Sequence, residues 1–280
     1  MTGAPAVQAQ QDISASAEVL YAVKDGIATI TLNRPERMNT ISRPMLMQLS
    51  QLLLDADRDP DVRVVILTAA GGRAFCAGLD LVAATSGEGI GSVNDRNNVS
   101  TTLDLKTAPP IVLFNMDKPT ICALNGSAAG YGLDTALGCD IRIAAESAKL
   151  AVAFVKRGVV PESGGTWFLP RMLGWAKASE LIFSGRTLSA KESLEMGLVN
   201  HVVPNDELMP RAIELAKEIA SNAPLAVQSA KRMMRMGLAE NFGEHVHHVY
   251  LQLLPLFRTE DFREGINSFM EKRPANFKGK

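Results

Sequence analysis

The 280-residue chain lacks the features that mark several large classes of protein. It has no basic excess, since 29 Lys+Arg are balanced by 30 Asp+Glu and the formal net charge is −1. A surface that follows nucleic-acid phosphates needs such an excess, so we expect no nucleic-acid partner. No run of about 18 apolar residues is present, so we expect neither a transmembrane helix nor a membrane partner.

Cysteine is scarce, and so are targeting signals. Cys76, Cys122 and Cys139 are an odd number of cysteines in apolar segments, which predicts buried thiols in a reducing compartment rather than a disulfide framework. The N-terminus has no basic segment followed by an apolar one, and no arginine precedes Arg34. Neither a secretory nor a mitochondrial signal fits this pattern, so we expect a cytoplasmic protein.

What the chain does contain is an alternation of strand and helix patterns. Residues 1–17 are rich in Ala, Gln and Ser and predict a disordered tail. Residues 19–32 predict a hairpin around Asp25-Gly26. Short, continuous apolar runs predict strands that are covered on both faces, at residues 64–69, 119–124 and 141–145. Strands separated by helical segments indicate an α/β fold.

Helix signals are also clear. Ser42 followed by Pro44 predicts a capped helix start, and we expect Met47 and Leu49 on the buried side of this helix. The polar segment 85–100 has no periodicity and predicts a mobile loop. After Val203-Pro204 the patterns are helical, and they predict helices at residues 206–222, 224–240, 241–258 and 260–273, with Pro255 ending or kinking the third. We therefore expect a core at 18–205 and a helical C-terminal region at 206–280.

Two glycine-rich turns follow buried strands, at residues 71–81 and 125–134. Backbone N–H groups gather where such a turn enters a helix, and the helix dipole favours negative charge there. One N–H group from each turn would form an oxyanion hole, which stabilises an enolate by several kcal/mol. A simpler explanation is that these glycines only make tight turns. A nucleotide site is not favoured, because neither G-x-G-x-x-G nor G-x-x-x-x-G-K-[ST] is present.

A set of motifs in a fixed order gives a family resemblance that runs from about residue 18 to the end. The motifs are Leu32-Asn33-Arg34-Pro35, Ala74-Phe75-Cys76-Ala77-Gly78-Leu79-Asp80, Ala123-Leu124-Asn125-Gly126, Cys139-Asp140-Ile141-Arg142, Gly185-Arg186, the segment 190–200, and Phe269-Met270-Glu271-Lys272-Arg273-Pro274. Together they resemble the crotonase, or enoyl-CoA hydratase/isomerase, superfamily. This resemblance implies a spiral of ββα units and a helical C-terminal region that assembles a homotrimer or a dimer of trimers.

The resemblance also implies a substrate and residues that bind it. The substrate is an acyl-CoA thioester whose carbonyl accepts hydrogen bonds from the N–H groups of Leu79 and Tyr131, so coenzyme A is part of the substrate and no separate cofactor is expected. Tyr131 replaces a more usual glycine, and its side chain must point away or shape the acyl pocket. By motif position, further CoA or substrate contacts fall on Ala77, Asp80 and Gly130, and on Arg73 and Lys272 near the CoA phosphates and adenine. His245, His247 and His248 come without a further ligand set, so we expect no metal site.

The acid/base carboxylate is less clearly defined. Hydratases of this superfamily use two glutamates, and those positions fall here on Asp134 and on Phe154, which cannot carry a proton. Glu162 stands just before Gly164-Gly165, where isomerase-type relatives carry a working carboxylate. Apolar neighbours would desolvate Glu162 and favour its protonated form, as a proton shuttle requires.

Three readings remain. We favour isomerase-type chemistry, with Glu162 as the catalytic acid and base. The alternative within enzymes is hydration by a pair formed from Asp134 and Glu162. The alternative of another class is a CoA-thioester-binding oligomeric protein without turnover, to which Phe154 points. Simpler roles for the two carboxylates are stabilising charges at helix N-termini.

Overall fold

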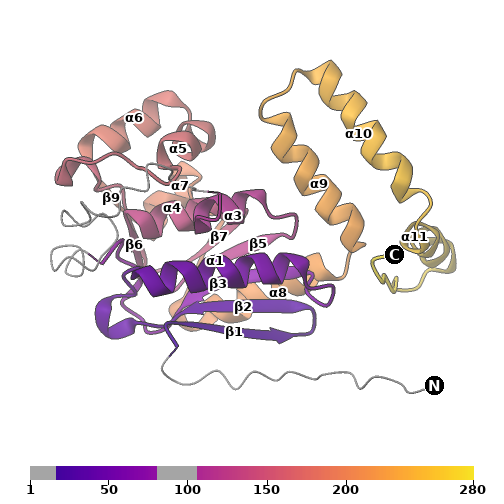
Figure 1. Cartoon of the computed structure of the whole chain (residues 1–280), viewed down its shortest axis with the longest axis horizontal. Helices are drawn as coiled ribbons and strands as arrows, with labels where there is room; N and C mark the ends of the chain where they lie inside the picture. The colour runs from indigo at the N-terminus through magenta and orange to yellow at the C-terminus, as the bar shows by residue number, and fades with distance from the viewer. Residues whose placement is uncertain (1–16, 81–105) are drawn as a thin grey trace, which may run out of the picture.

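The structure is a computed structural model that describes residues 17–80 and 106–280. The predicted tail, apart from its last residue, and the predicted loop at 85–100 lie outside the described residues. Two sheets form the centre of the molecule (Figure 1). The larger sheet has the spatial order β1 (Val19–Lys24), β2 (Ile27–Leu32), β3 (Val64–Ala69), β5 (Thr120–Leu124), β7 (Ile141–Ala145) and β10 (His201–Val203). The smaller sheet has the order β4 (Ala74–Cys76), β6 (Ser127–Ala129), β8 (Lys149–Ala151) and β9 (Thr187–Ser189).

Successive strands are shared between the two sheets. β3, β5 and β7 lie in the larger sheet and run parallel, and the strand after each of them, β4, β6 or β8, lies in the smaller sheet. β1 and β2 pair antiparallel as the predicted hairpin. This repeated strand–strand unit confirms the mixed α/β spiral that the sequence predicted. The three-residue strands of the smaller sheet were not predicted.

The helix after Ser42 and the four C-terminal helices lie near their predicted positions, and further helices lie between them. They are α1 (Arg43–Arg58), α3 (Pro109–Asn115), α4 (Tyr131–Gly138), α5 (Gly165–Leu173), α6 (Trp175–Ser184), α7 (Ala190–Met196), α8 (Leu208–Ala220), α9 (Pro224–Gly237), α10 (Phe242–Leu256) and α11 (Glu260–Glu271), with 3-10 turns η1 (Pro35–Arg37), η3 (Val155–Arg157) and η4 (Asn205–Glu207). Ser42 caps α1, its side chain accepting the Met45 N–H, as predicted. The prediction that Met47 is buried is wrong: it is exposed, because Met45, Leu49 and Leu53 define the inward side of α1. Pro255 lies in the last turn of α10, one residue before its end.

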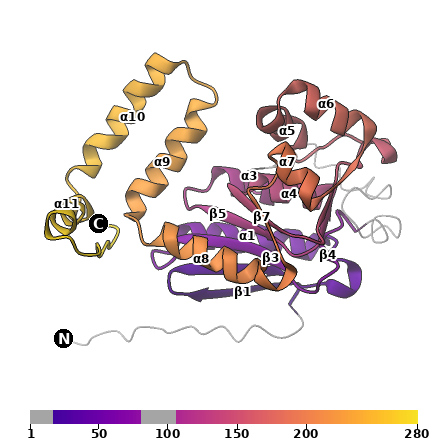
Figure 2. The ribbon, with the colours of Figure 1, turned by 180° about the vertical axis from the view of Figure 1, so that it is seen from behind.

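The buried strands have apolar side chains on both faces, as their continuous apolar runs predicted. Val64 and Ile66 of β3 point toward α8, which covers that face of the sheet through Ala212 and Ala216 (Figure 2). Val65 and the other inward side chains of β3 join the main core on the opposite face. All three cysteines are free and buried, as expected.

The predicted helical C-terminal region has two parts. α8 packs on the sheet, whereas α9 and α10 project from the core as a helical hairpin with α11 at its base, on the side away from β4 and β6 (Figures 1 and 2). Ion pairs join α9 to the core: Lys231 Nζ lies 2.7 Å from Asp140 Oδ2, and Arg235 Nη2 lies 3.2 Å from Asp117 Oδ1. Within the described residues, α10 has no buried side chain, so this hairpin presents large apolar groups to solvent.

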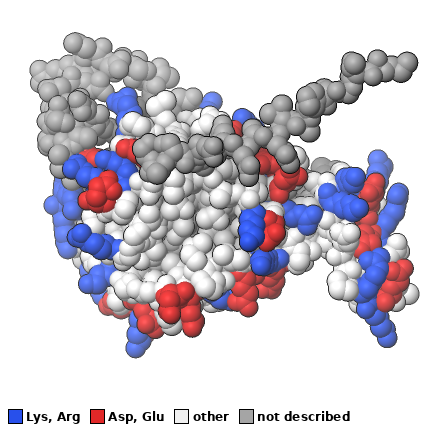
Figure 3. Space-filling model, turned by 90° about the horizontal axis from the view of Figure 1, so that it is seen from below, with Lys and Arg blue, Asp and Glu red and all other residues white. Residues whose placement is uncertain are grey.

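Charge is distributed without a dominant sign on the face seen in Figure 3. Basic and acidic side chains are interspersed around an uncharged middle, and the projecting helical part carries both signs. Among the helices of residues 17–80 and 106–280, none is long and apolar enough to cross a bilayer.

Candidate active site

The fold brings the two glycine-rich turns into direct contact. Gly78 and Gly130 both have positive φ, +105° and +52°, where side chains are disfavoured. A Cβ atom added to Gly78 would lie 3.2 Å from the Ala129 carbonyl oxygen and 3.8 Å from the Tyr131 nitrogen. The turns after β3 and β5 thus meet backbone to backbone, as the oxyanion-hole hypothesis requires.

The two predicted donors flank this contact. Tyr131 is the first residue of α4, so its N–H group has no partner within the helix. The bridge between Leu79 and Ile41 does not use the Leu79 N–H. The Ile41 N–H donates to the Gly78 carbonyl, and the Asp80 N–H donates to the Ile41 carbonyl. Neither the Leu79 nor the Tyr131 N–H donates to a backbone carbonyl elsewhere in the described part of the chain. A cavity of about 110 Å³ lies between the turns, and its lining includes Leu79, Tyr131, Ala77, Gly130 and Glu162.

Two further glycines allow this close approach. A Cβ at Gly132 would lie 2.4 Å from the Cys76 carbonyl oxygen, and one at Gly126 would lie 2.7 Å from the Ala74 nitrogen. Both clashes are with backbone atoms, which cannot move aside as a flexible side chain can. These two glycines therefore serve close packing of the backbone, whereas Gly78 and Gly130 line the small cavity.

Glu162 occupies the position between two cavities. It lines the small cavity of the glycine turns and also a second cavity of about 470 Å³ that extends toward α3 and α5. Glu162 is exposed in the single chain, so the prediction that its neighbours remove it from water is wrong there. The reason is local: Val160, one of the apolar neighbours in the sequence, is itself 66% exposed, and Val159 beside it is 52% exposed.

Asp134 is the desolvated carboxylate. It lies on α4, where every residue is buried, and its own side chain has no exposed surface. Oδ2 accepts the Ser163 N–H at 3.0 Å, while Oδ1 has no hydrogen-bond partner in the described part of the structure. Burial raises the pKa of Asp134 to about 7, with the Ser163 N–H acting to lower it and the Glu162 charge acting to raise it.

This geometry connects Asp134 to Glu162 through the backbone. Ser163 follows Glu162 directly, so the bond to its N–H fixes the turn that presents Glu162. A Cβ at Gly165 would lie 2.5 Å from Asp134 Oδ1, so only glycine lets the turn approach this carboxylate. Asp134 does not line either cavity at Glu162. The arrangement suits Asp134 as a positioning residue.

Tyr131 stands where a glycine is more usual, and its side chain was expected to point away from the acyl pocket or to shape it. Its side chain is 7% exposed and its hydroxyl is buried, with no hydrogen-bond partner in the described residues. Burial raises the Tyr131 pKa, and the nearby Glu162 charge acts in the same direction. The phenol therefore stays protonated, and Tyr131 belongs to the lining of the small cavity.

Phe154 and Arg157 belong to the same cavity lining. Phe154 is 4% exposed, so the position that carries a glutamate in hydratases is an apolar wall here. Arg157 and Ser163 were not singled out in the sequence. The available signal for Arg157 was its place three residues after Phe154, because a 3-10 turn brings residues three apart to the same side of the chain.

The remaining predicted contact residues differ in placement. The Asp80 carboxylate is buried and binds Arg34 and Arg37, each at 3.2 Å. These ion pairs hold the end of the first glycine-rich turn against the segment that contains the two arginines. Arg73 is exposed where β3 leads into β4. Neither residue lines the small cavity.

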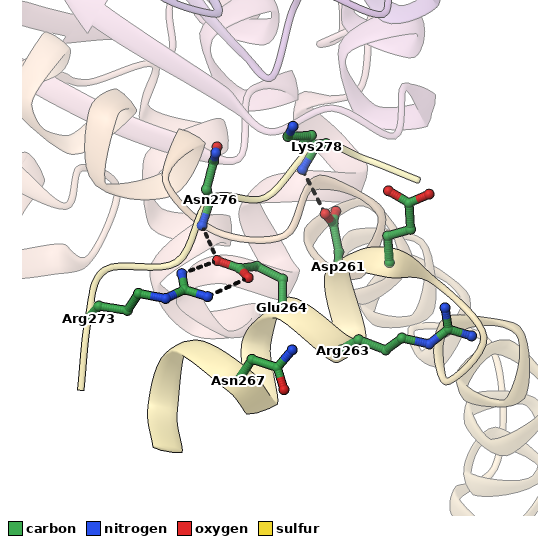
Figure 4. Close-up of a pocket in the computed structure, with 8 residues that line it drawn as sticks. Asp261, Arg263, Glu264, Asn267, Arg273, Asn276 and Lys278 are labelled. Atoms are coloured by element: carbon green, nitrogen blue, oxygen red, sulfur yellow. Dashed lines mark hydrogen bonds and ion pairs between the residues drawn. The ribbon is translucent and has the colours of Figure 1, made fainter. Parts of the chain in front are cut away.

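Lys272 is not brought to the site within one chain. It ends α11, in the helical part that lies away from β4 and β6 (Figure 1). Its neighbour Arg273 holds Glu264 through two ion-paired nitrogens, and the Asn276 N–H donates to the same carboxylate at 2.8 Å (Figure 4). These bonds tie the last residues to α11. Elsewhere in this region His245 and His248 both contact Glu240, at 3.0 and 2.8 Å.

Comparison with known proteins decides the family. Residues 22–280 match the enoyl-CoA hydratase/isomerase family. The chain belongs to this family.

The relatives of this enoyl-CoA hydratase/isomerase family member cover nearly its whole length. A Bacillus subtilis protein, YngF, assigned as an enoyl-CoA hydratase/isomerase, is 41% identical over 265 residues, which is 93% of this chain and 98% of that protein. A 1,2-epoxyphenylacetyl-CoA isomerase of Escherichia coli is 38% identical over 273 residues, 94% of this chain and 98% of that protein. The crystal structure of an enoyl-CoA hydratase from Bacillus anthracis superposes with a TM-score of 0.86 at 36% identity, covering 94% of this chain and 100% of that chain. The protein is therefore an enzyme of the crotonase superfamily.

Proposed function

We propose that this enzyme moves a double bond along an acyl-CoA thioester, with Glu162 as the single proton-shuttling group. The observation that carries the proposal is that Glu162 lines the cavity between the two glycine turns, whereas Asp134 does not. The E. coli relative is named an isomerase, which is compatible with this chemistry.

The proposed reaction begins with a 3-enoyl thioester. The Glu162 carboxylate takes a proton from C2, and the electron pair moves into the thioester to form a dienolate. The Leu79 and Tyr131 N–H groups donate to the enolate oxygen, where charge develops, and stabilise it. Glu162 then returns its proton to C4 as the dienolate collapses to the 2-enoyl thioester. Coenzyme A is carried by the substrate, so the proposal needs no separate cofactor.

Hydration by Asp134 and Glu162 is the second candidate. It is favoured by the Asp134 pKa of about 7 and by the closeness of the two charges. The buried position of Asp134 weighs against it, because a water-activating group must reach the water at about 3 Å. Its Oδ2 atom is also engaged by the Ser163 N–H.

A substrate panel tests the proposal. We expect turnover of linear 3-enoyl thioesters to their 2-enoyl isomers at a kcat/KM at least about 100-fold above that for hydration of crotonyl-CoA, since Glu162 is the one carboxylate among the described lining residues of the cavity. Ultraviolet absorbance of the conjugated thioester follows both reactions. A higher kcat/KM for hydration would reject the isomerase assignment.

Binding of the CoA part is proposed for Arg73 and Lys272. Arg73 is exposed next to the first glycine turn and is free to approach a phosphate. Lys272 lies at the opposite side of the same chain, so its proposed contact would be with coenzyme A bound to a neighbouring subunit.

We also propose that the chain forms a homotrimer or a dimer of trimers through α9–α11. The projecting helices expose many large apolar side chains, including Phe242 and Phe269 at 83% and 81%, and so much exposed apolar surface in one region is unusual on a monomer. Light scattering at micromolar concentration should give a mass of about 90 kDa or twice that, from three or six chains of 30.1 kDa. A stable mass near 30.1 kDa across a dilution series would contradict this prediction.

A further inference from the structure

The cavity beyond Glu162 has an aromatic wall. Phe114 from α3 and Trp167 and Phe168 from α5 meet pairwise edge to face. Their ring centroids are 5.1 Å apart for Phe114–Trp167, 5.6 Å for Phe114–Phe168 and 5.2 Å for Trp167–Phe168. Each ring is held by the other two in the geometry that aromatic quadrupoles prefer.

Groups outside the wall fix it further. The Arg171 guanidinium lies 4.0 Å from the Trp167 ring centroid, and Nη1 of Arg171 donates to the Trp167 carbonyl at 3.1 Å. A Cβ at Gly164 would lie 2.7 Å from Cε2 of Phe168, so the Glu162 turn packs directly against that ring. The shape of the wall is thus set before any ligand enters.

The rest of the lining is apolar and short. Ala108, Pro110 and Ile111, at and just before the start of α3, also line the cavity, and among the described lining residues the polar side chains are those of Glu162 and Ser163. The cavity of about 470 Å³ falls within the range of whole small-molecule sites, about 300–1,000 Å³, yet it would receive only the acyl part of the thioester. Its volume therefore leaves room for an acyl group bulkier than a single extended hydrocarbon chain.

Resting on the proposed function, we infer that the acyl group accepted here carries an aromatic ring, so that the substrate class is aryl-substituted acyl thioesters. Each edge-to-face or offset contact between a ligand ring and the wall adds about 2- to 10-fold in affinity beyond simple burial. A linear chain of the same carbon number gains no such contact, and it loses the freedom of more rotatable bonds on binding.

Binding of unreactive thioesters of equal carbon number tests the inference. Phenylacetyl-CoA, cyclohexylacetyl-CoA and octanoyl-CoA share the CoA part and have eight acyl carbons each, which include an aromatic ring, a saturated ring or no ring, respectively. By calorimetry on the full-length enzyme, we expect phenylacetyl-CoA to bind at least about tenfold more tightly than octanoyl-CoA, and several-fold more tightly than cyclohexylacetyl-CoA. Equal dissociation constants for phenylacetyl-CoA and either of the others would overturn the inference.

The chain offers a matched pair of tryptophan variants. Trp167→Leu should reduce the preference for phenylacetyl-CoA over octanoyl-CoA by about fivefold or more and leave the affinity for free CoA unchanged. Phe114→Leu should do the same, which provides a second test if the first variant folds poorly. Trp175→Leu is the control, because Trp175 is 76% exposed on α6, outside the cavity. An equal loss in the Trp175 variant would count against the cavity as the cause.

The binding readout separates this inference from the proposed reaction. A retained preference for phenylacetyl-CoA without isomerisation of any 3-enoyl thioester rejects the isomerase assignment and keeps the aryl cavity. Isomerisation of linear and aryl 3-enoyl thioesters with equal kcat/KM, together with equal binding, rejects the aryl cavity and keeps the isomerase.

Discussion

Glu162→Gln lowers isomerase turnover by at least about 100-fold, the scale on which a positioned general acid–base group acts. Glutamine preserves the shape and hydrogen-bonding capacity of the side chain but cannot take the proton from C2. Because Glu162 borders the cavity and forms no hydrogen bond or ion pair in the described part of the structure, its loss should leave folding intact. The expected result is a fall in kcat with little change in the affinity for an unreactive acyl-CoA.

Steady-state kinetics and calorimetry measure the two quantities. Glu195→Gln is the matched control, since Glu195 is an exposed glutamate on α7 that forms only a surface ion pair with Lys191 at 3.9 Å. Turnover by the Glu162 variant at the wild-type rate would place the working carboxylate elsewhere. Glu162→Asp, which keeps the acid one methylene shorter, should fall between the wild type and Glu162→Gln.

Asp134→Asn changes the pH dependence of stability. The folded-state pKa of Asp134, about 7, lies above its ordinary value of 3.8, so the folded protein holds this proton more tightly than the unfolded chain does. The stabilisation is complete below pH 3.8 and is lost as the pH rises through 7. Between pH 5 and pH 8 the wild type should lose about 2–3 kcal/mol from this group, since one pKa unit corresponds to about 1.4 kcal/mol.

Asparagine at position 134 cannot ionise, so the variant lacks this loss. The free energy of unfolding of Asp134→Asn, relative to the wild type, should rise by about 2–3 kcal/mol from pH 5 to pH 8, as measured by urea denaturation. Taking the difference cancels the other titrating groups. A difference that stays constant over this range would show that Asp134 titrates normally.

The same variant separates the two reactions. If Asp134 only holds the Ser163 N–H and so positions Glu162, isomerisation by Asp134→Asn should fall by only a few-fold, because the amide oxygen accepts the same bond. If Asp134 and Glu162 act as a pair on a water, hydration should fall by about 100-fold or more. Equal and severe losses of hydration activity in Asp134→Asn and Glu162→Gln would make the enzyme a two-carboxylate hydratase.

Much of the architecture could be predicted from the sequence because its signals are local. The apolar run of β3, the Asp25-Gly26 turn and the Ser42 cap act over a few residues, and each reports its own burial or backbone geometry. The proposed donors Leu79 and Tyr131 came from the position of their motifs in the family resemblance, and they stay a prediction; such a transfer is possible because backbone donation depends little on side chains. The three-residue strands β4 and β6 were missed because they are too short to show a periodicity.

Only the tertiary structure decided which carboxylate is buried. Asp134 is polar in the sequence, yet α4 carries it into the core, and the Gly165 backbone lets the Glu162 turn close over it. Glu162 has apolar neighbours in the sequence, yet it is exposed, because Val159 and Val160 point to solvent. Desolvation depends on everything packed around a group, most of it distant in the chain. Sequence neighbours therefore determined the turns and their glycines, while the assembly of separate elements determined the charge state of Asp134 and the aromatic cavity at Glu162.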